Sequence, residues 1–192
     1  MNDTKSSINT NDNSFLIKES ETSFEKQTVE NNDILKTHII DSIALCLEEL
    51  IKDKRKTAHD IFYLSLIPKI SLNEYIKNLI KLTNMNISTL IIAIIYIDRF
   101  CYLNNYILTI NNIYRILIST CLLSLKFNQD EKITNKKYSE IVHVSIKDLK
   151  ILEFQMYLKL QFSLVVEIKL YKKYFDYFSN YSLPQLKRTK SI

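Results

Sequence analysis

The fold of this chain is decided by residues 88–103, which read STLIIAIIYIDRFCYL. Every side chain from Leu90 to Ile97 is apolar or aromatic, so no polar stripe is left to face water. A helix that is apolar nearly all round is buried on several sides. The run stops at Asp98-Arg99, well short of the roughly 20 apolar residues that a bilayer span needs. This stretch therefore predicts a buried helix in the core of an all-α domain.

Helix signals also precede this stretch. Asp33 can cap a helix whose apolar residues recur at three- and four-residue spacing. Ser71 and Glu74 form a capping-box pattern, which opens a helix running through Leu82. Ser88 is expected to cap the central helix itself.

Similar signals follow it. Asn111 is expected to cap a helix over residues 113–127, and Ser145 a helix over residues 146–158. Residues 138–142 indicate a short helix between these two, and residues 167–178 a final amphipathic helix. Residues 161–166 are expected to form an extended link, because no partner strand is in view. The pattern predicts about five helices between residues 71 and 160, with one more on either side.

The composition excludes several kinds of chemistry. Glycine is absent from all 192 residues, and proline occurs only at Pro68 and Pro184. Gly-rich phosphate loops, dinucleotide fingerprints and the nucleophile elbow of hydrolases all need backbone without a Cβ. Apolar residues make up 46% of the chain, which is enough for a core. We expect a non-catalytic protein with no catalytic residues and no cofactor.

The cysteines favour an intracellular protein. Cys46, Cys101 and Cys121 are odd in number, widely spaced and set in separate apolar runs. This pattern predicts reduced core thiols in the cytoplasm or nucleus rather than disulfides. The three histidines show no paired-ligand spacing, so no metal site is expected.

Three regions are expected along the chain. Residues 1–32 are polar and show neither helical nor strand periodicity, which predicts a disordered tail. Residues 33–180 are expected to form the domain, with a central box at about 71–160, and residues 181–192 a basic tail. The net charge of +5 comes largely from clusters at 52–56 and 187–190. These clusters are not arranged along one face together with stacking aromatic residues, as a nucleic-acid-binding surface would be, so their side chains are expected to be solvated. Neither a nucleic acid nor a membrane is expected as a partner.

Three runs, in their order and spacing, resemble parts of the cyclin box. IIYIDRF at 94–100 resembles its second helix, LSLKF at 123–127 the end of its third, and KDLKILE at 147–153 its fifth. The likeness covers about residues 34–178. It implies a single cyclin-box five-helix fold with flanking N- and C-terminal helices. It also implies a regulatory subunit that binds and activates a cyclin-dependent protein kinase, with a role in the cell cycle.

Two further runs are similar to the P-type cyclins, the group named for phosphate-pathway kinase partners. They are PKISLNEYI at 68–76 and LKLQFSLVV at 158–166. The chain departs from the family where the loop before the fifth helix reads Val142-His143 instead of containing glycine. It also lacks the Met-Arg-x-x-Leu motif and the tryptophan of the cell-cycle cyclins, so their substrate-docking function is not carried over.

The resemblance assigns Lys126 and Glu153 to kinase contact. In cyclins, the lysine and glutamate at these positions hydrogen-bond to backbone near the kinase's mobile helix. Both side chains are expected to be exposed in the free protein. Asp98 and Arg99 are given structural roles. The arginine that normally pairs with this aspartate is replaced by Asn78, which is expected to offer Asp98 a neutral hydrogen bond.

The residues alone also allow plainer interpretations. Lys126 is then a helix C-terminal charge favoured by the dipole, and Glu153 an ordinary solvated side chain. Two other functions stay open: a cyclin-fold module that binds DNA or general factors in transcription, and a helical adaptor without a kinase partner. Salt-dependent retention on DNA favours the first of these, and a pull-down that lacks any kinase favours the second.

Overall fold

The computed structural model describes residues 32–51 and 60–181. The chain divides into two compact units, residues 1–37 and 38–192. Of the first unit only residues 32–37 are described, and they are helical. The polar tail predicted for residues 1–32, the basic cluster at 52–56 and the basic tail at 181–192 lie almost wholly outside the described residues.

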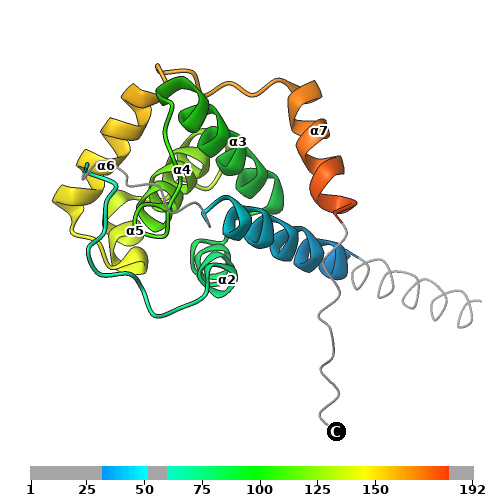
Figure 1. Cartoon of the computed structure of the whole chain (residues 1–192), viewed down its shortest axis with the longest axis horizontal. Coiled ribbons are helices and arrows are strands. Elements are labelled where there is room, and N and C mark those ends of the chain that lie inside the picture. Colours follow the sequence, from blue (N-terminus) through cyan, green and yellow to red (C-terminus); the bar gives the residue numbers. More distant parts are fainter. Residues whose placement is uncertain (1–31, 52–59, 182–192) are drawn as a thin grey trace, which may run out of the picture. The chain divides into compact units, whose positions relative to one another are not determined.

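The regular structure of the described residues is entirely helical, with no strand among them. A helix over residues 32–50 comes first. It is followed by α2 (Leu72–Thr83), α3 (Ile87–Asn104), α4 (Ile113–Asn128), α5 (Asn135–Val142), α6 (Ile146–Lys159) and α7 (Ile168–Ser179) (Figure 1). The predicted fold class is confirmed, and so is the order of five helices flanked by one on either side.

Helix α3 is a core helix. It packs against α4, α6 and α7, and its buried side chains point in several directions around the axis. Ile91, Ile95, Tyr96 and Phe100 are all nearly inaccessible to solvent. The helix is long and apolar enough to cross a membrane, but half of that span is buried inside the fold. Burial against other helices accounts for its composition, as the sequence predicted.

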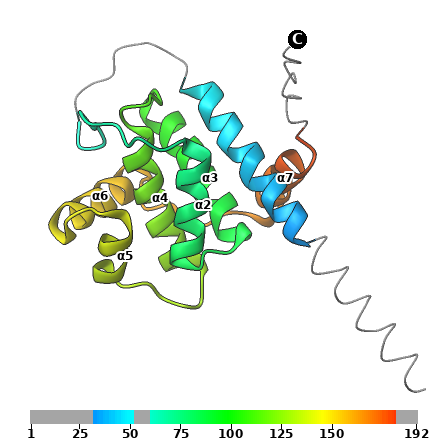
Figure 2. The ribbon, with the colours of Figure 1, turned by 90° about the horizontal axis from the view of Figure 1, so that it is seen from below.

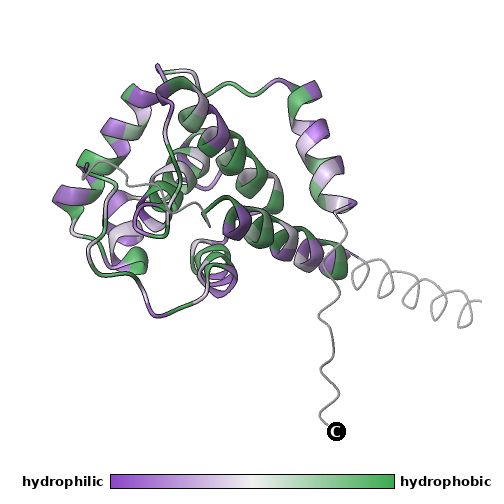
Figure 3. Cartoon of the chain, viewed as in Figure 1, coloured by the Kyte–Doolittle hydropathy of each residue, from purple (hydrophilic) through white to green (hydrophobic). Residues whose placement is uncertain are grey.

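Helix α4 lies directly against α3, and both are mostly hydrophobic along their length (Figure 3). Small side chains on α4, including Ser119, Cys121 and Ser124, are buried in the core. The Ser124 hydroxyl donates a hydrogen bond of 2.6 Å to the backbone carbonyl of Thr89 on α3. A larger residue would hold the two helices apart, so the small residues permit this close packing.

Two of the predicted N-caps are confirmed. The Ser71 hydroxyl accepts a hydrogen bond from the backbone N–H of Glu74, at 3.2 Å, and α2 begins at the next residue. The Ser145 hydroxyl accepts from the backbone N–H of Asp148 at 3.0 Å, and α6 follows. Each serine supplies an acceptor to an N–H that has no partner within the helix.

Two other predicted caps are wrong by one or two residues. Asn86, not Ser88, caps α3, because its side-chain oxygen accepts from the backbone N–H of Thr89 at 2.7 Å. Helix α4 begins after Asn112 rather than Asn111, and Asn112 makes no capping bond. The Asn112 side chain instead bonds backward, to the backbone of Ile107 and Thr109, and closes the loop that precedes α4.

The chain ends several helices in the left-handed conformation without any glycine. Asn84, Asn105 and His143 are the C-cap residues of α2, α3 and α5, with φ values of 54°, 46° and 53°. Asparagine tolerates this region better than most residues because its short polar side chain can bond locally. Histidine also occurs in this region more often than most residues, but its Cβ carries a cost that glycine avoids, so the departure noted at Val142-His143 leaves this cap less favourable than a glycine would be.

The extended link predicted for residues 161–166 is wrong at its start, because Gln161 and Phe162 form a turn with positive φ values of 53° and 59°. Side chains of α3 hold the rest of the link in place. Residues 163–167 have no regular structure. The Tyr96 hydroxyl donates to the Leu164 carbonyl at 2.7 Å, and the Arg99 guanidinium donates to the carbonyls of Ser163 and Val165. These bonds satisfy link carbonyls that have no ladder partner.

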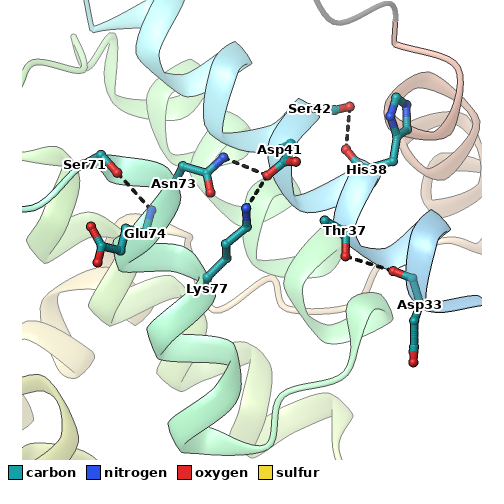
Figure 4. Close-up of polar contacts among 9 residues, drawn as sticks. All are labelled: Asp33, Thr37, His38, Asp41, Ser42, Ser71, Asn73, Glu74 and Lys77. Carbon is teal, nitrogen blue, oxygen red and sulfur yellow. Dashed lines mark hydrogen bonds and ion pairs between the residues drawn. The ribbon is translucent and has the colours of Figure 1, made fainter.

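Residues 38–50 contact both α2 and α7 (Figure 2). On the α2 side, the Asp41 carboxylate accepts from the Asn73 amide at 2.8 Å and pairs with the Lys77 ammonium at 2.6 Å (Figure 4). Burial acts to raise the pKa of Asp41, but the hydrogen bonds from Lys77 and Asn73 outweigh it and bring that pKa below its ordinary value.

Candidate functional site

The two residues that the resemblance assigns to kinase contact lie against each other. Lys126 is in the last turn of α4, and Glu153 is in the middle of α6, which packs against α4. The Lys126 ammonium and the Glu153 carboxylate are 2.6 Å apart. Helix α6 turns Leu149, Leu152 and Met156 into the core, and this leaves Glu153 at the edge of the buried face.

Polar side chains of neighbouring residues support this ion pair. The Asn135 amide, at the start of α5, donates to the other Glu153 oxygen at 2.9 Å. The Lys132 ammonium donates to the backbone carbonyls of Lys126 and Gln129, each at 2.9 Å, and so caps the end of α4. Both Glu153 oxygens therefore have a donor in the free chain. Neither Asn135 nor Lys132 could be recognised from the sequence, because a loop brings them to the site.

The expectation that Lys126 and Glu153 are exposed is corrected by the structure. Their side chains keep only 30% and 20% of their accessible surface. The cause is mutual contact, because each covers part of the other, with Asn135 on the far side of the carboxylate. Pairing lowers the cost of partial burial for both charges.

An open apolar hollow of about 370 Å³ lies beside the pair. Its lining comes from α4, α6 and the following link: Leu123, Lys126, Phe127, Lys150, Glu153, Phe154, Tyr157 and Leu164. Phe127 and Phe154 are 54% and 56% exposed. Aromatic side chains of this kind are enriched in protein–protein interfaces relative to the rest of protein surfaces.

Asn78 and Asp98 do not form the expected hydrogen bond. Asp98 is exposed on α3, and its carboxylate accepts from the Tyr174 hydroxyl of α7 at 2.7 Å. Asn78 lies on α2 and lines a different hollow, together with residues of α4 and α6. The expected bond does not form because Asp98 points toward α7 and away from α2. Arg99 holds the link to α7, so both members of the Asp98-Arg99 pair contact the C-terminal part of the domain.

The described residues have neither a metal-binding cluster nor, at Cys101 and Cys121, an activated thiol. They contain no cluster of three or more His, Cys, Asp or Glu side chains that could hold a metal. Burial raises the pKa of the Cys121 thiol to about 12, and burial together with the Asp98 charge raises that of Cys101 to about 12. Both thiols therefore stay protonated at neutral pH and are poor nucleophiles.

The described residues thus form a helical domain that carries a charged pair and an open apolar hollow on its α4–α6 surface. A family model described as "Cyclin" matches residues 3–164, most of the chain. The chain belongs to the cyclin family, whose members are non-catalytic regulatory subunits.

The most similar proteins include several plant cyclins. Cyclin-U2-1 of Arabidopsis thaliana is 27% identical over 109 residues, 56% of this chain and 49% of its own length. Cyclin-U4-1 of the same plant is 30% identical over 112 residues, 57% and 55% of the two chains. Cyclin-P3-1 of Oryza sativa subsp. japonica is 25% identical over 128 residues, 66% and 54% of the two chains. The matched part thus spans about half the length of these relatives.

Proposed function

We propose that this cyclin binds a cyclin-dependent protein kinase through the α4–α6 surface and activates it. The observation that carries the proposal is the paired Lys126 and Glu153 beside the open hollow with its two exposed phenylalanines. Charged groups make stronger hydrogen bonds to backbone than neutral groups do. The hollow offers apolar area for a helix of the kinase, and the ion pair offers one donor and one acceptor that fix its position.

Activation then needs no chemistry from the cyclin. A kinase transfers phosphate only when the helix bearing its conserved glutamate is turned inward, so that the lysine–glutamate pair can orient ATP. Binding energy from the α4–α6 surface favours that inward state and shifts the kinase population toward it. We further propose that the partner is a kinase of the P-type cyclin pathway, and that the complex acts in the cytoplasm or nucleus. The resemblance of residues 68–76 and 158–166, Cyclin-P3-1 among the relatives, and the free thiols support these finer points.

The decisive variant exchanges the two charges: Lys126→Glu with Glu153→Lys in the same full-length chain. Opposite charges remain at both positions, so the ion pair can re-form and the free protein should melt at nearly the wild-type temperature. The donor and acceptor presented to the kinase are exchanged, however. Losing one partner of a buried charged contact costs about 2–5 kcal/mol, so kinase affinity should fall at least about 25-fold.

The measurements are capture of the kinase from the native cell, phosphate transfer by the captured kinase, and circular dichroism on the same preparations. Lys173→Glu is the matched control, because it reverses an exposed lysine on α7, away from the α4–α6 surface. It should retain wild-type capture. A folded exchange variant that captures and activates the kinase as well as wild type would refute the proposal.

A further inference from the structure

A second hollow, of about 510 Å³, opens on the other face of α3, where α3 meets residues 43–50 and α7. Buried side chains form its floor, among them Ile43, Ile97 and Phe178. Leu50 and Tyr177 stand at its rim, 59% and 55% exposed. Helix α7 has a single fully buried residue, Phe178, so it covers this region only in part. The volume lies within the range of sites that take a ligand or an anchoring side chain.

The charged side chains that line this hollow have one sign. Glu49 and Asp98 line it, and no lysine, arginine or histidine does. Each carboxylate accepts from one tyrosine, Glu49 from Tyr181 at 3.3 Å and Asp98 from Tyr174 at 2.7 Å. A carboxylate can accept several hydrogen bonds, so both retain acceptor capacity. The hollow is therefore matched to an occupant that has an apolar side chain next to basic side chains.

We propose that the occupant is the chain's own C-terminal segment, residues 182–192, which reads SLPQLKRTKSI and lies outside the described residues. Leu183 and Leu186 are its apolar anchors, and Lys187, Arg188 and Lys190 supply three positive charges without any acidic residue. In the docked state Leu186 enters the hollow while Lys187 and Arg188 pair with Glu49 and Asp98.

The point at which this segment begins supports binding within one chain. Tyr181, the last described residue, already bonds to Glu49 at the rim of the hollow. From there to Leu186 an extended chain reaches roughly 17 Å at about 3.4 Å per residue. The tether keeps the segment at a high effective concentration, so weak contacts are enough to populate the docked state. The segment would cover the hollow against other basic partners. This inference does not depend on kinase binding at α4–α6.

Native cysteines allow a test on the full chain. Cys46 lines the hollow and is partly exposed, whereas Cys121 is fully buried elsewhere in the core. Alkylation by N-ethylmaleimide, followed residue by residue with mass spectrometry, therefore reports docking at Cys46 and unfolding at Cys121. Replacing Leu186→Ser, Lys187→Gln and Arg188→Gln together should speed Cys46 alkylation about tenfold, which corresponds to loss of a state docked nine-tenths of the time.

A second variant tests the acceptor side. Glu49→Gln with Asp98→Asn keeps an acceptor for both tyrosines but removes the charges, and it should speed Cys46 alkylation to the same extent. Combining both sets of changes should give no further increase, because the two sets remove one interaction. Equal Cys46 rates in all variants, with Cys121 protected throughout, would overturn the proposal. Protection of Cys46 that increases with protein concentration would also overturn it, because the segment would then come from a second copy.

Discussion

At the scale of single residues, Asp41 joins residues 38–50 to α2. Its contribution to the free energy of unfolding depends on pH. Its folded-state pKa lies below the ordinary value, so it adds stability above the unfolded pKa near 3.9 and loses it as pH falls through the folded pKa. Because Asp41 and Lys77 are partly solvated, the pair should contribute only about 0.2–1 kcal/mol. Asp41→Asn should therefore unfold at lower urea concentration than wild type at pH 7, and the difference should shrink as pH falls below the unfolded pKa. A difference that grows toward low pH would contradict the assigned pairing.

The single residues also show where the sequence was informative. Lys126 and Glu153 were found through motif order, and the structure places them in contact. The same resemblance predicts that Asn78 bonds to Asp98, and the structure gives Asp98 a tyrosine partner from α7 instead. A local motif carries the position of a residue on its helix. The partner of a side chain depends on how distant helices pack, and no local pattern contains that information.

At the scale of helices, the left-handed cap at His143 is a site where the chain is not optimal. A residue with a Cβ pays about 1–2 kcal/mol in this conformation. Glycine avoids that cost but gains unfolded-state freedom worth about 0.4–1 kcal/mol. His143→Gly should therefore raise the free energy of unfolding by about 0.5–1 kcal/mol in denaturant melts, whereas His143→Ala, which keeps the Cβ, should not. A loss of stability in the glycine variant would mean that the imidazole makes a compensating contact.

The order of the helices was predictable from the sequence, whereas the N-terminal boundaries of α3 and α4 were not. Apolar spacing reports which face of a helix is buried, and that requirement extends over many residues. A boundary rests on one hydrogen bond, and several polar residues near Ile87 and Ile113 are equally able to make it. Asn86 caps α3 instead of Ser88, because the backbone N–H of Thr89 lies within reach of its side-chain oxygen. The side-chain oxygen of Asn112 accepts from the backbone N–H of Thr109, which precedes α4, and so it does not cap the helix.

At the scale of the whole molecule, α4 and α6 contribute to stability and to the proposed partner binding through different side chains. Their inner faces build the core around α3, while their outer edges leave the hollow beside Lys126 and Glu153 open. The sequence predicted the core because burial constrains many positions at once. It did not predict the hollow, because Phe127 and Phe154 have the same apolar character as the buried residues beside them. Exposure distinguishes the two groups, and exposure follows from the packed fold.

This separation can be tested with one pair of variants. Leu117→Ala removes a fully buried side chain on α4, which should cost about 2–5 kcal/mol of stability through loss of burial and an unfilled cavity. Phe154→Ala removes a half-exposed ring at the hollow, which should change stability by no more than about 0.5 kcal/mol. If that ring anchors the kinase, its loss should cost about 2 kcal/mol of binding free energy, close to a 25-fold weaker affinity.

Urea melts and kinase titrations of both variants, at a temperature where Leu117→Ala stays folded, give the comparison. Leu117→Ala should then bind almost normally despite its low stability, and Phe154→Ala should bind poorly despite its normal stability. The reverse pattern would place the binding surface elsewhere on the fold.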